Sequence, residues 1–92
     1  MTGRTLVSPP AVHWVQDAGQ VLVVNEDTGS AVSLPGFEAA VWKWFSLSYN
    51  HADVLAFLRE AIDRPEEEAR LLLDQCITRW VGLGLLVQEG AR

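Results

Sequence analysis

The stretch that decides the fold is Gly29-Ser30-Ala31-Val32-Ser33-Leu34-Pro35, an uncharged segment that follows a turn signal and ends at a proline. Its short run between these turn residues predicts a strand over Ser30–Leu34. A free strand edge leaves backbone N–H and C=O groups unpaired, and proteins usually protect it with lysine, proline or a bulge. No lysine or proline lies inside Ser30–Leu34. The segment is therefore predicted to form an open edge that can accept a peptide as an added strand.

Two further strands are predicted before this one. Val12–Gln16 carries β-branched and aromatic residues and is followed by a turn signal. Gln20–Asn25 is apolar at consecutive positions, which is typical of a central strand covered on both faces. Short hairpin connections place Gln20–Asn25 in the middle of the sheet. One edge strand is then Val12–Gln16, which is preceded by Pro9-Pro10, two residues that cannot donate hydrogen bonds to a ladder. The other edge strand is Ser30–Leu34.

The hydrophobic period changes after Pro35 to the helical value of about 3.6 residues. The first predicted helix ends around Ser46–Ser48. Its apolar stripe consists of Phe37, Ala40, Val41, Trp44 and Phe45. Trp42 lies off this stripe, so either a second packed face or a contact with a partner accounts for it.

Two more helices follow. Asn50 is a good N-cap for the second helix, and Pro65 suits the first turn of a third helix over roughly Pro65–Val81. The third helix has two partly apolar stripes, so it is either sandwiched or has a groove beside it. The first stripe consists of Ala69, Leu72, Cys76, Trp80 and Leu83, and the second, of mixed polarity, includes Arg70, Leu73, Asp74 and Ile77.

The predicted fold class is α+β, with a three-stranded antiparallel sheet followed by three helices. Ninety-two residues make one domain, which we expect over residues 12–88. Residues 1–11 are expected to form a flexible N-terminal tail, and residues 89–92 a short C-terminal tail.

Composition excludes several classes of function. A net charge of −5 disfavours binding to a phosphate backbone, and no apolar run approaches the ~20 residues that span a membrane. The N-terminus lacks the apolar region of a signal peptide, so we expect a cytoplasmic protein.

The sequence offers little for catalysis. Cys76, the single cysteine, lies on an apolar stripe and is expected to be a buried structural thiol instead of a nucleophile. His13 and His51 lack metal-ligand spacing, and no phosphate-binding loop occurs. We therefore expect no enzyme activity, no metal and no cofactor, which leaves a binding module.

Two parts of the chain resemble the PqqD-like family. The first is Val21-Leu-Val-Val24, Thr28-Gly29 and Leu34-Pro-Gly-Phe-Glu-Ala-Ala-Val-Trp42; the second is Leu72–Leu86, which ends in Gly84-Leu85-Leu86. The resemblance covers roughly residues 12–87. It implies a winged helix-turn-helix-like domain that acts as a recognition element for ribosomally synthesised, post-translationally modified peptides.

Members of that family bind the leader segment of a precursor peptide and present it to a separate modifying enzyme. That enzyme is a radical SAM enzyme, a leader peptidase or a cyclase, as in pyrroloquinoline quinone and lasso-peptide pathways. Carried over by position, the resemblance implies that the leader pairs with the third strand and lies against the third helix. The implied peptide-binding residues are Ser30, Ala31, Val32, Ser33, Leu34, Arg70, Leu73, Asp74 and Ile77.

Two alternatives stay open at this stage. A DNA-binding winged helix has an overlapping topology, but it needs a basic recognition helix, and the third helix offers Arg70 and Arg79 against several acidic residues. A structural or dimerisation domain, in which the open edge pairs with its own copy, fits the same strand pattern.

Overall fold

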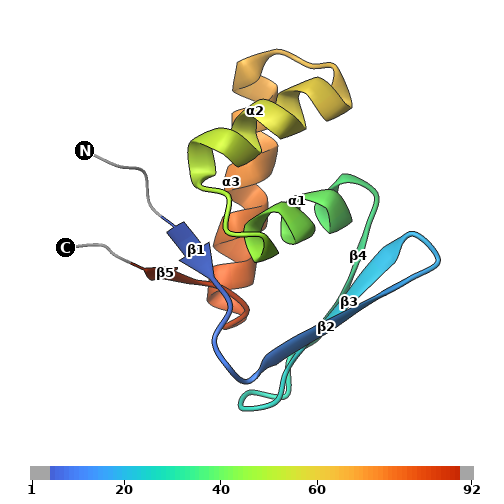
Figure 1. Ribbon diagram of the computed structural model, residues 1–92, viewed down its shortest axis with the longest axis vertical. Helices are drawn as coiled ribbons and strands as arrows, with labels where there is room; N and C mark the ends of the chain where they lie inside the picture. Colours follow the sequence, from blue (N-terminus) through green and yellow to red (C-terminus); the bar gives the residue numbers. More distant parts are fainter. Residues whose placement is uncertain (1–4, 90–92) are drawn as a thin grey trace.

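The computed structural model describes residues 5–89, shown in Figure 1. The first and last strands of this range pair with each other. A three-stranded sheet and three helices lie between them in the sequence. In chain order the elements are β1 (Thr5–Val7), β2 (Val12–Asp17), β3 (Gln20–Asn25), β4 (Ala31–Pro35), α1 (Phe37–Ser46), α2 (His51–Ile62), α3 (Glu66–Gly82) and β5 (Val87–Glu89).

The larger sheet has the strand order β2-β3-β4, and both pairs are antiparallel. The β2–β3 turn contains Ala18 and Gly19, both with positive φ, as a two-residue type I′ hairpin requires. A three-stranded antiparallel sheet followed by three helices is the predicted α+β arrangement, which is thus confirmed. The strand predicted over Ser30–Leu34 is shifted by one residue. The winged helix-turn-helix likeness stays a prediction.

A second, two-stranded sheet was not predicted from the sequence. β1 pairs antiparallel with β5, so that Leu6 stands opposite Gln88. Leu6 is buried in the core. The prediction of a flexible tail over residues 1–11 is therefore wrong for Thr5–Val7, and Glu89 belongs to β5 and not to a tail. The predictions for residues 1–4 and 90–92 concern positions outside the described residues.

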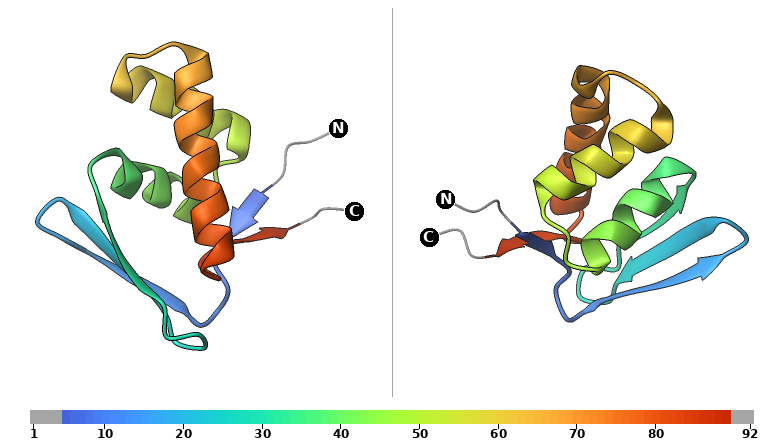
Figure 2. Two further views of the ribbon diagram at one scale, coloured as in Figure 1. Left: turned by 180° about the vertical axis from the view of Figure 1, so that it is seen from behind. Right: turned by 45° about the horizontal axis from the view of Figure 1, so that its top comes forward.

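The β2-β3-β4 sheet is covered on one face only. Val21 and Val23 of β3 are fully buried beneath α1, together with Leu34 of β4. Leu22 points to the opposite face and is 45% exposed, and its neighbour Val15 on β2 is also exposed. The prediction that β3 is covered on both faces is wrong, because all three helices pack on the same side of the sheet (Figure 2).

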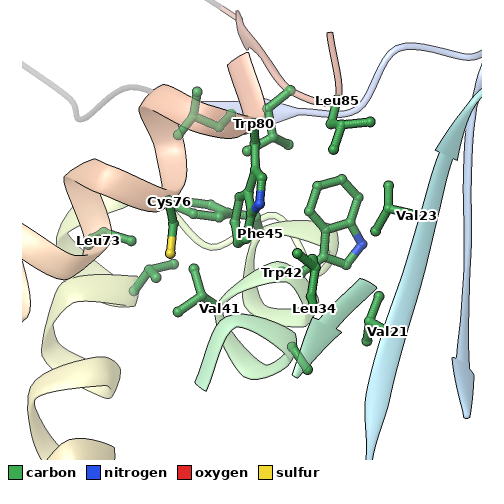
Figure 3. Packing of buried hydrophobic residues seen from close by; sticks show 14 of the residues in the cluster. Val21, Val23, Leu34, Val41, Trp42, Phe45, Leu73, Cys76, Trp80 and Leu85 are labelled. Carbon is green, nitrogen blue, oxygen red and sulfur yellow. The ribbon is translucent and has the colours of Figure 1, made fainter. Parts of the chain in front are cut away.

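The core is built around two tryptophans. Trp42 of α1 is 1% exposed and packs edge to face against Trp80 of α3, with ring centroids 5.4 Å apart and planes at 85°. Figure 3 shows Trp42 between this ring and the β3 valines. Such aromatic pairs add about 0.5–1.5 kcal/mol beyond the area they bury. Trp42 therefore belongs to a second packed face of α1, and its burial removes the alternative of a partner contact.

The predicted cap of α2 is also confirmed. Asn50 Oδ1 accepts a hydrogen bond from the Asp53 N–H at 2.9 Å, which satisfies one of the free donors at the start of the helix. α3 begins directly after Pro65, as expected.

Asn25 connects the sheet to the end of α3. Its side chain is 4% exposed, and Nδ2 donates a hydrogen bond to the Gly84 carbonyl at 2.7 Å. Oδ1 accepts from the N–H groups of Asp27 and Thr28, which shapes the β3–β4 turn. Gly84 has φ +76, and a Cβ there would lie 3.1 Å from Asn25 Nδ2. The close approach therefore favours glycine at position 84.

The Asn25–Gly84 contact gives a first prediction. Asn25→Asp keeps the acceptor for Asp27 and Thr28 but replaces the donor with an oxygen that faces the Gly84 carbonyl. Leaving a buried carbonyl unsatisfied costs about 1–3 kcal/mol, and this contact is partly buried, so we expect a loss of up to about that size in the free energy of unfolding. Urea denaturation followed by circular dichroism measures it. The exposed Asp27→Asn is the control, and equal midpoints for both variants would contradict the role given to Asn25.

Candidate functional site

The backbone of β4 presents an open ladder on the side away from β3. The Asn25 N–H donates to the Ser30 carbonyl at 2.9 Å, and hydrogen-bonded pairs alternate along an antiparallel ladder. In this register Val32 and Leu34 direct their N–H and C=O groups toward β3, whereas Ala31 and Ser33 direct theirs outward. Within residues 5–89, no strand pairs with this outer edge.

The open edge has a defined end. Pro35 occupies the next outward position after Ser33, opposite Gln20, and proline has no N–H to donate. An added strand can therefore form its ladder with the backbone of Ala31 and Ser33 and loses a donor at Pro35. Of the five residues predicted here, these two present backbone groups at the edge. Val32 and Leu34 use theirs on the β3 side, and the Leu34 side chain is buried in the core. The Ser30 carbonyl accepts from Asn25 of β3, and its N–H donates to the Thr28 hydroxyl within the turn.

The resemblance implies four peptide-binding residues on α3, and the structure does not bring them together along this edge. They are Arg70, Leu73, Asp74 and Ile77. Arg70 forms an ion pair with Glu66 and lines a pocket with residues of α2. Asp74 also faces α2, with its carboxylate 3.5 Å from His51 Nε2. Leu73 is 0% exposed in the core, and Ile77 is half-buried against it. The mixed-polarity stripe of α3 thus packs toward α2 and the core.

The other stripe of α3 forms a pocket with the start of α1. This pocket of about 160 Å³ is lined by Phe37, Glu38, Leu72, Gln75, Cys76 and Arg79. Glu38 and Arg79 form an ion pair across it. Because only Gly36 separates Phe37 from Pro35, the pocket begins where the β4 edge ends.

A second hollow continues from this pocket along α3. It has a volume of about 320 Å³ and is lined by Ile62, Arg64, Glu68, Leu71 and Leu72. Leu72 lines both hollows, and Leu71 is exposed to solvent. We call the two together the α3 groove. α3 is the helix nearest the viewer in the left panel of Figure 2.

Cys76 lies at the base of the α3 groove and is nearly buried. Burial raises the pKa of its thiol to about 11, and the nearby Glu38 carboxylate adds to this, while Arg79 acts in the opposite direction. The thiol is therefore protonated at neutral pH and is a poor nucleophile. This placement agrees with the prediction of a buried structural thiol.

The histidines each face a single carboxylate. His13 Nε2 lies 3.6 Å from Glu26, and His51 contacts Asp74 as described above. In the part of the chain that the structure describes, no three His, Cys, Asp or Glu side chains are grouped so that they could hold a metal ion. Over the same residues, no helix combines the length and apolarity that crossing a membrane requires.

No family model, curated protein or solved structure matches this chain. Function is therefore inferred from the β4 edge and the α3 groove. Sequence reasoning missed Phe37, Leu72, Gln75 and Arg79 as groove residues. A signal was present, since Leu72 and Cys76 share a helical stripe with Gln75 and Arg79 beside it, but the resemblance directed attention to the other stripe.

The state of Cys76 gives a second prediction. Native protein should react slowly with iodoacetamide at pH 8, and the rate should rise with pH toward about 11, because the thiolate is the reacting species. Protein unfolded in urea should titrate near the ordinary value of 9.0 and serves as the control. Equal rates for native and unfolded protein at pH 8 would show that the thiol is exposed and unperturbed.

Proposed function

We propose that this protein is a non-catalytic recognition domain that binds an extended peptide by strand addition to β4. The observation that carries the proposal is the pair of outward-facing residues, Ala31 and Ser33, on an edge that leads directly into the α3 groove. Backbone groups of a guest strand bind the edge, and its side chains enter the groove. Main-chain bonding with side-chain pockets is a recurring mode of peptide recognition.

The peptide that we propose is the leader segment of a ribosomally made precursor. The resemblance of Val21–Trp42 and Leu72–Leu86 to the PqqD-like family supports this choice. In that proposal the domain presents the precursor to a separate modifying enzyme, such as a radical SAM enzyme, a leader peptidase or a cyclase. Precursors of this kind are made on ribosomes, so the proposed place of action is the cytoplasm.

The energetics assign different roles to the edge and the groove. Each hydrogen bond to Ala31 or Ser33 contributes about 0.5–1.5 kcal/mol net. Ordering a flexible segment costs about 2–5 kcal/mol, which is comparable to the sum of these bonds. Apolar side chains buried in the groove, at about 1.5–3 kcal/mol each, therefore determine the affinity. A leader that binds well should carry a large apolar residue where it passes Leu72.

The charges on α3 favour a peptide over DNA. The arginines of the described residues are Arg59, Arg64, Arg70 and Arg79, and each lies within ion-pair distance of a glutamate. DNA binding needs cations that are free to neutralise phosphates. The α3 surface instead presents paired charges around apolar side chains.

A third prediction separates the outward ladder from the rest of the strand. Ser33→Pro removes an outward N–H while leaving the β3–β4 ladder intact, because the Ser33 N–H does not bond to β3. We expect affinity for the leader to fall about tenfold or more, which corresponds to ~1.4 kcal/mol. Calorimetric titration with a candidate leader, the N-terminal segment of a short precursor peptide where one is encoded next to this gene, measures it.

The matched control is Ser33→Ala, which keeps the N–H and should keep the affinity. Unchanged binding by a folded Ser33→Pro variant would refute strand addition at β4. Light scattering of the free protein addresses the self-pairing alternative: a dimer that dissociates on Ser33→Pro and ignores the leader would support pairing between copies.

A fourth prediction separates the two faces of α3. Leu72→Gln places an amide in the groove and should weaken leader binding about tenfold, because it removes the burial of a large apolar contact. Arg70→Ala alters the face toward α2 and should leave the affinity unchanged. Thermal denaturation checks that both variants fold. If Arg70→Ala weakened leader binding and Leu72→Gln did not, the leader would bind the face of α3 that the resemblance implies. That result would exclude the α3 groove as the leader site.

A further inference from the structure

The C-terminal end of α1 and one face of α2 form a pocket that the proposed leader site does not use. It has a volume of about 470 Å³ and is lined by Trp44, Leu47, Tyr49, Phe57, Glu60 and Ala61. None of these residues belongs to the β4 edge or to the α3 groove. The hollow that Phe37 and Glu38 line lies at the start of α1, whereas this pocket lies at the end of that helix.

Three aromatic rings form the walls of this pocket. Phe57 contacts Trp44 at a centroid distance of 5.4 Å with planes at 52°, and Tyr49 at 5.0 Å with planes at 85°. Rings at such angles can present both faces and edges to a side chain that enters the pocket. Tyr49 remains 39% exposed, although burying it would be favourable. The short turn that carries Tyr49 contains Ser48 at φ +70, a conformation that a non-glycine residue adopts at a cost in energy.

The charge around the rings is negative. Glu60 lines the pocket, and Asp53, Phe57 and Glu60 share one face of α2 by their spacing of four and three residues. The basic residues that adjoin the lining in sequence are engaged elsewhere. Lys43 Nζ donates to Gln16 Oε1 at 3.3 Å, and Arg59 lies 3.7 Å from Glu66. An ionised carboxylate beside aromatic faces, without a basic partner in the lining, is suited to a cation from another molecule.

We propose that this aromatic pocket binds an arginine side chain on the surface of a partner protein. The planar guanidinium can stack on the rings while its N–H groups donate to the Glu60 carboxylate. The pocket is open at Leu47 and Tyr49, which are exposed, so it can receive a side chain projecting from a larger surface. A free small molecule would instead need a site that encloses most of its surface.

The test is a titration, without leader peptide, of a capped pentapeptide that carries one arginine among glycines and serines. The readout is the NMR shift of the Trp44 indole N–H and of the Tyr49 and Phe57 rings, up to about 10 mM peptide. The matched peptide carries citrulline, which has the same shape without the charge. We expect the arginine peptide to shift these signals. The citrulline peptide should bind at least about tenfold more weakly.

Two matched variants locate the charge. Glu60→Gln and Glu67→Gln each remove one negative charge, but only Glu60 lines the pocket. Glu60→Gln should weaken arginine binding at least about threefold, and Glu67→Gln should leave it unchanged. If the net charge of the protein attracted the arginine, both substitutions would weaken binding equally. Tyr49→Leu should abolish the shifts at Trp44 with the fold intact by circular dichroism.

Several results would overturn the assignment. Equal affinity for the citrulline peptide would show that the pocket recognises the apolar part of the side chain and not its charge. Equal effects of Glu60→Gln and Glu67→Gln would show that the binding depends on the net charge of the protein and not on Glu60. The absence of any shift at the highest concentration would exclude arginine. None of these results bears on leader binding at β4, which depends on other residues.

Discussion

The hydrogen bond from Asn25 Nδ2 to the Gly84 carbonyl is the constraint on which the arrangement of the β4 edge and the α3 groove depends. It joins residues 59 positions apart, the last residue of β3 and the turn that follows α3. A carbonyl near a helix end needs a partner when it is buried, and the buried amide supplies one. The same side chain shapes the turn into β4. One residue thus fixes both the start of the open strand and the end of the helix that forms the groove.

The one-sided packing of the sheet follows from where the helices lie. α1 uses its middle for the core, with Val41, Trp42 and Phe45 buried. Its first residue, Phe37, faces the α3 groove, and Trp44 near its end faces the aromatic pocket. A ten-residue helix therefore separates two surfaces that a partner could reach independently. Such a layout suits a protein that holds one polypeptide while contacting another.

Sequence reasoning succeeded where the signal was local. The Asn50 cap, the break at Pro35 and the period of each helix all depend on neighbouring residues, and the types of the three central strands and the three helices were predicted correctly. It failed where a contact depended on distant residues. The pairing of β1 with β5 joins the two ends of the described chain, and three-residue strands are too short to show alternation. Which stripe of α3 faces the start of α1 likewise depends on distant residues, and it was not predicted.

The sequence by itself determined the order of the three central strands and the three helices, the absence of lysine and proline inside Ser30–Leu34 and the excess of acidic charge. Only the tertiary structure decided that Ala31 and Ser33 face outward, and that Leu72, instead of Leu73, lines the groove. The physical reason is that hydrophobic period identifies which residues are apolar together, but not what they pack against. The phase of a ladder and the rotation of a helix are set by contacts between segments far apart in the chain.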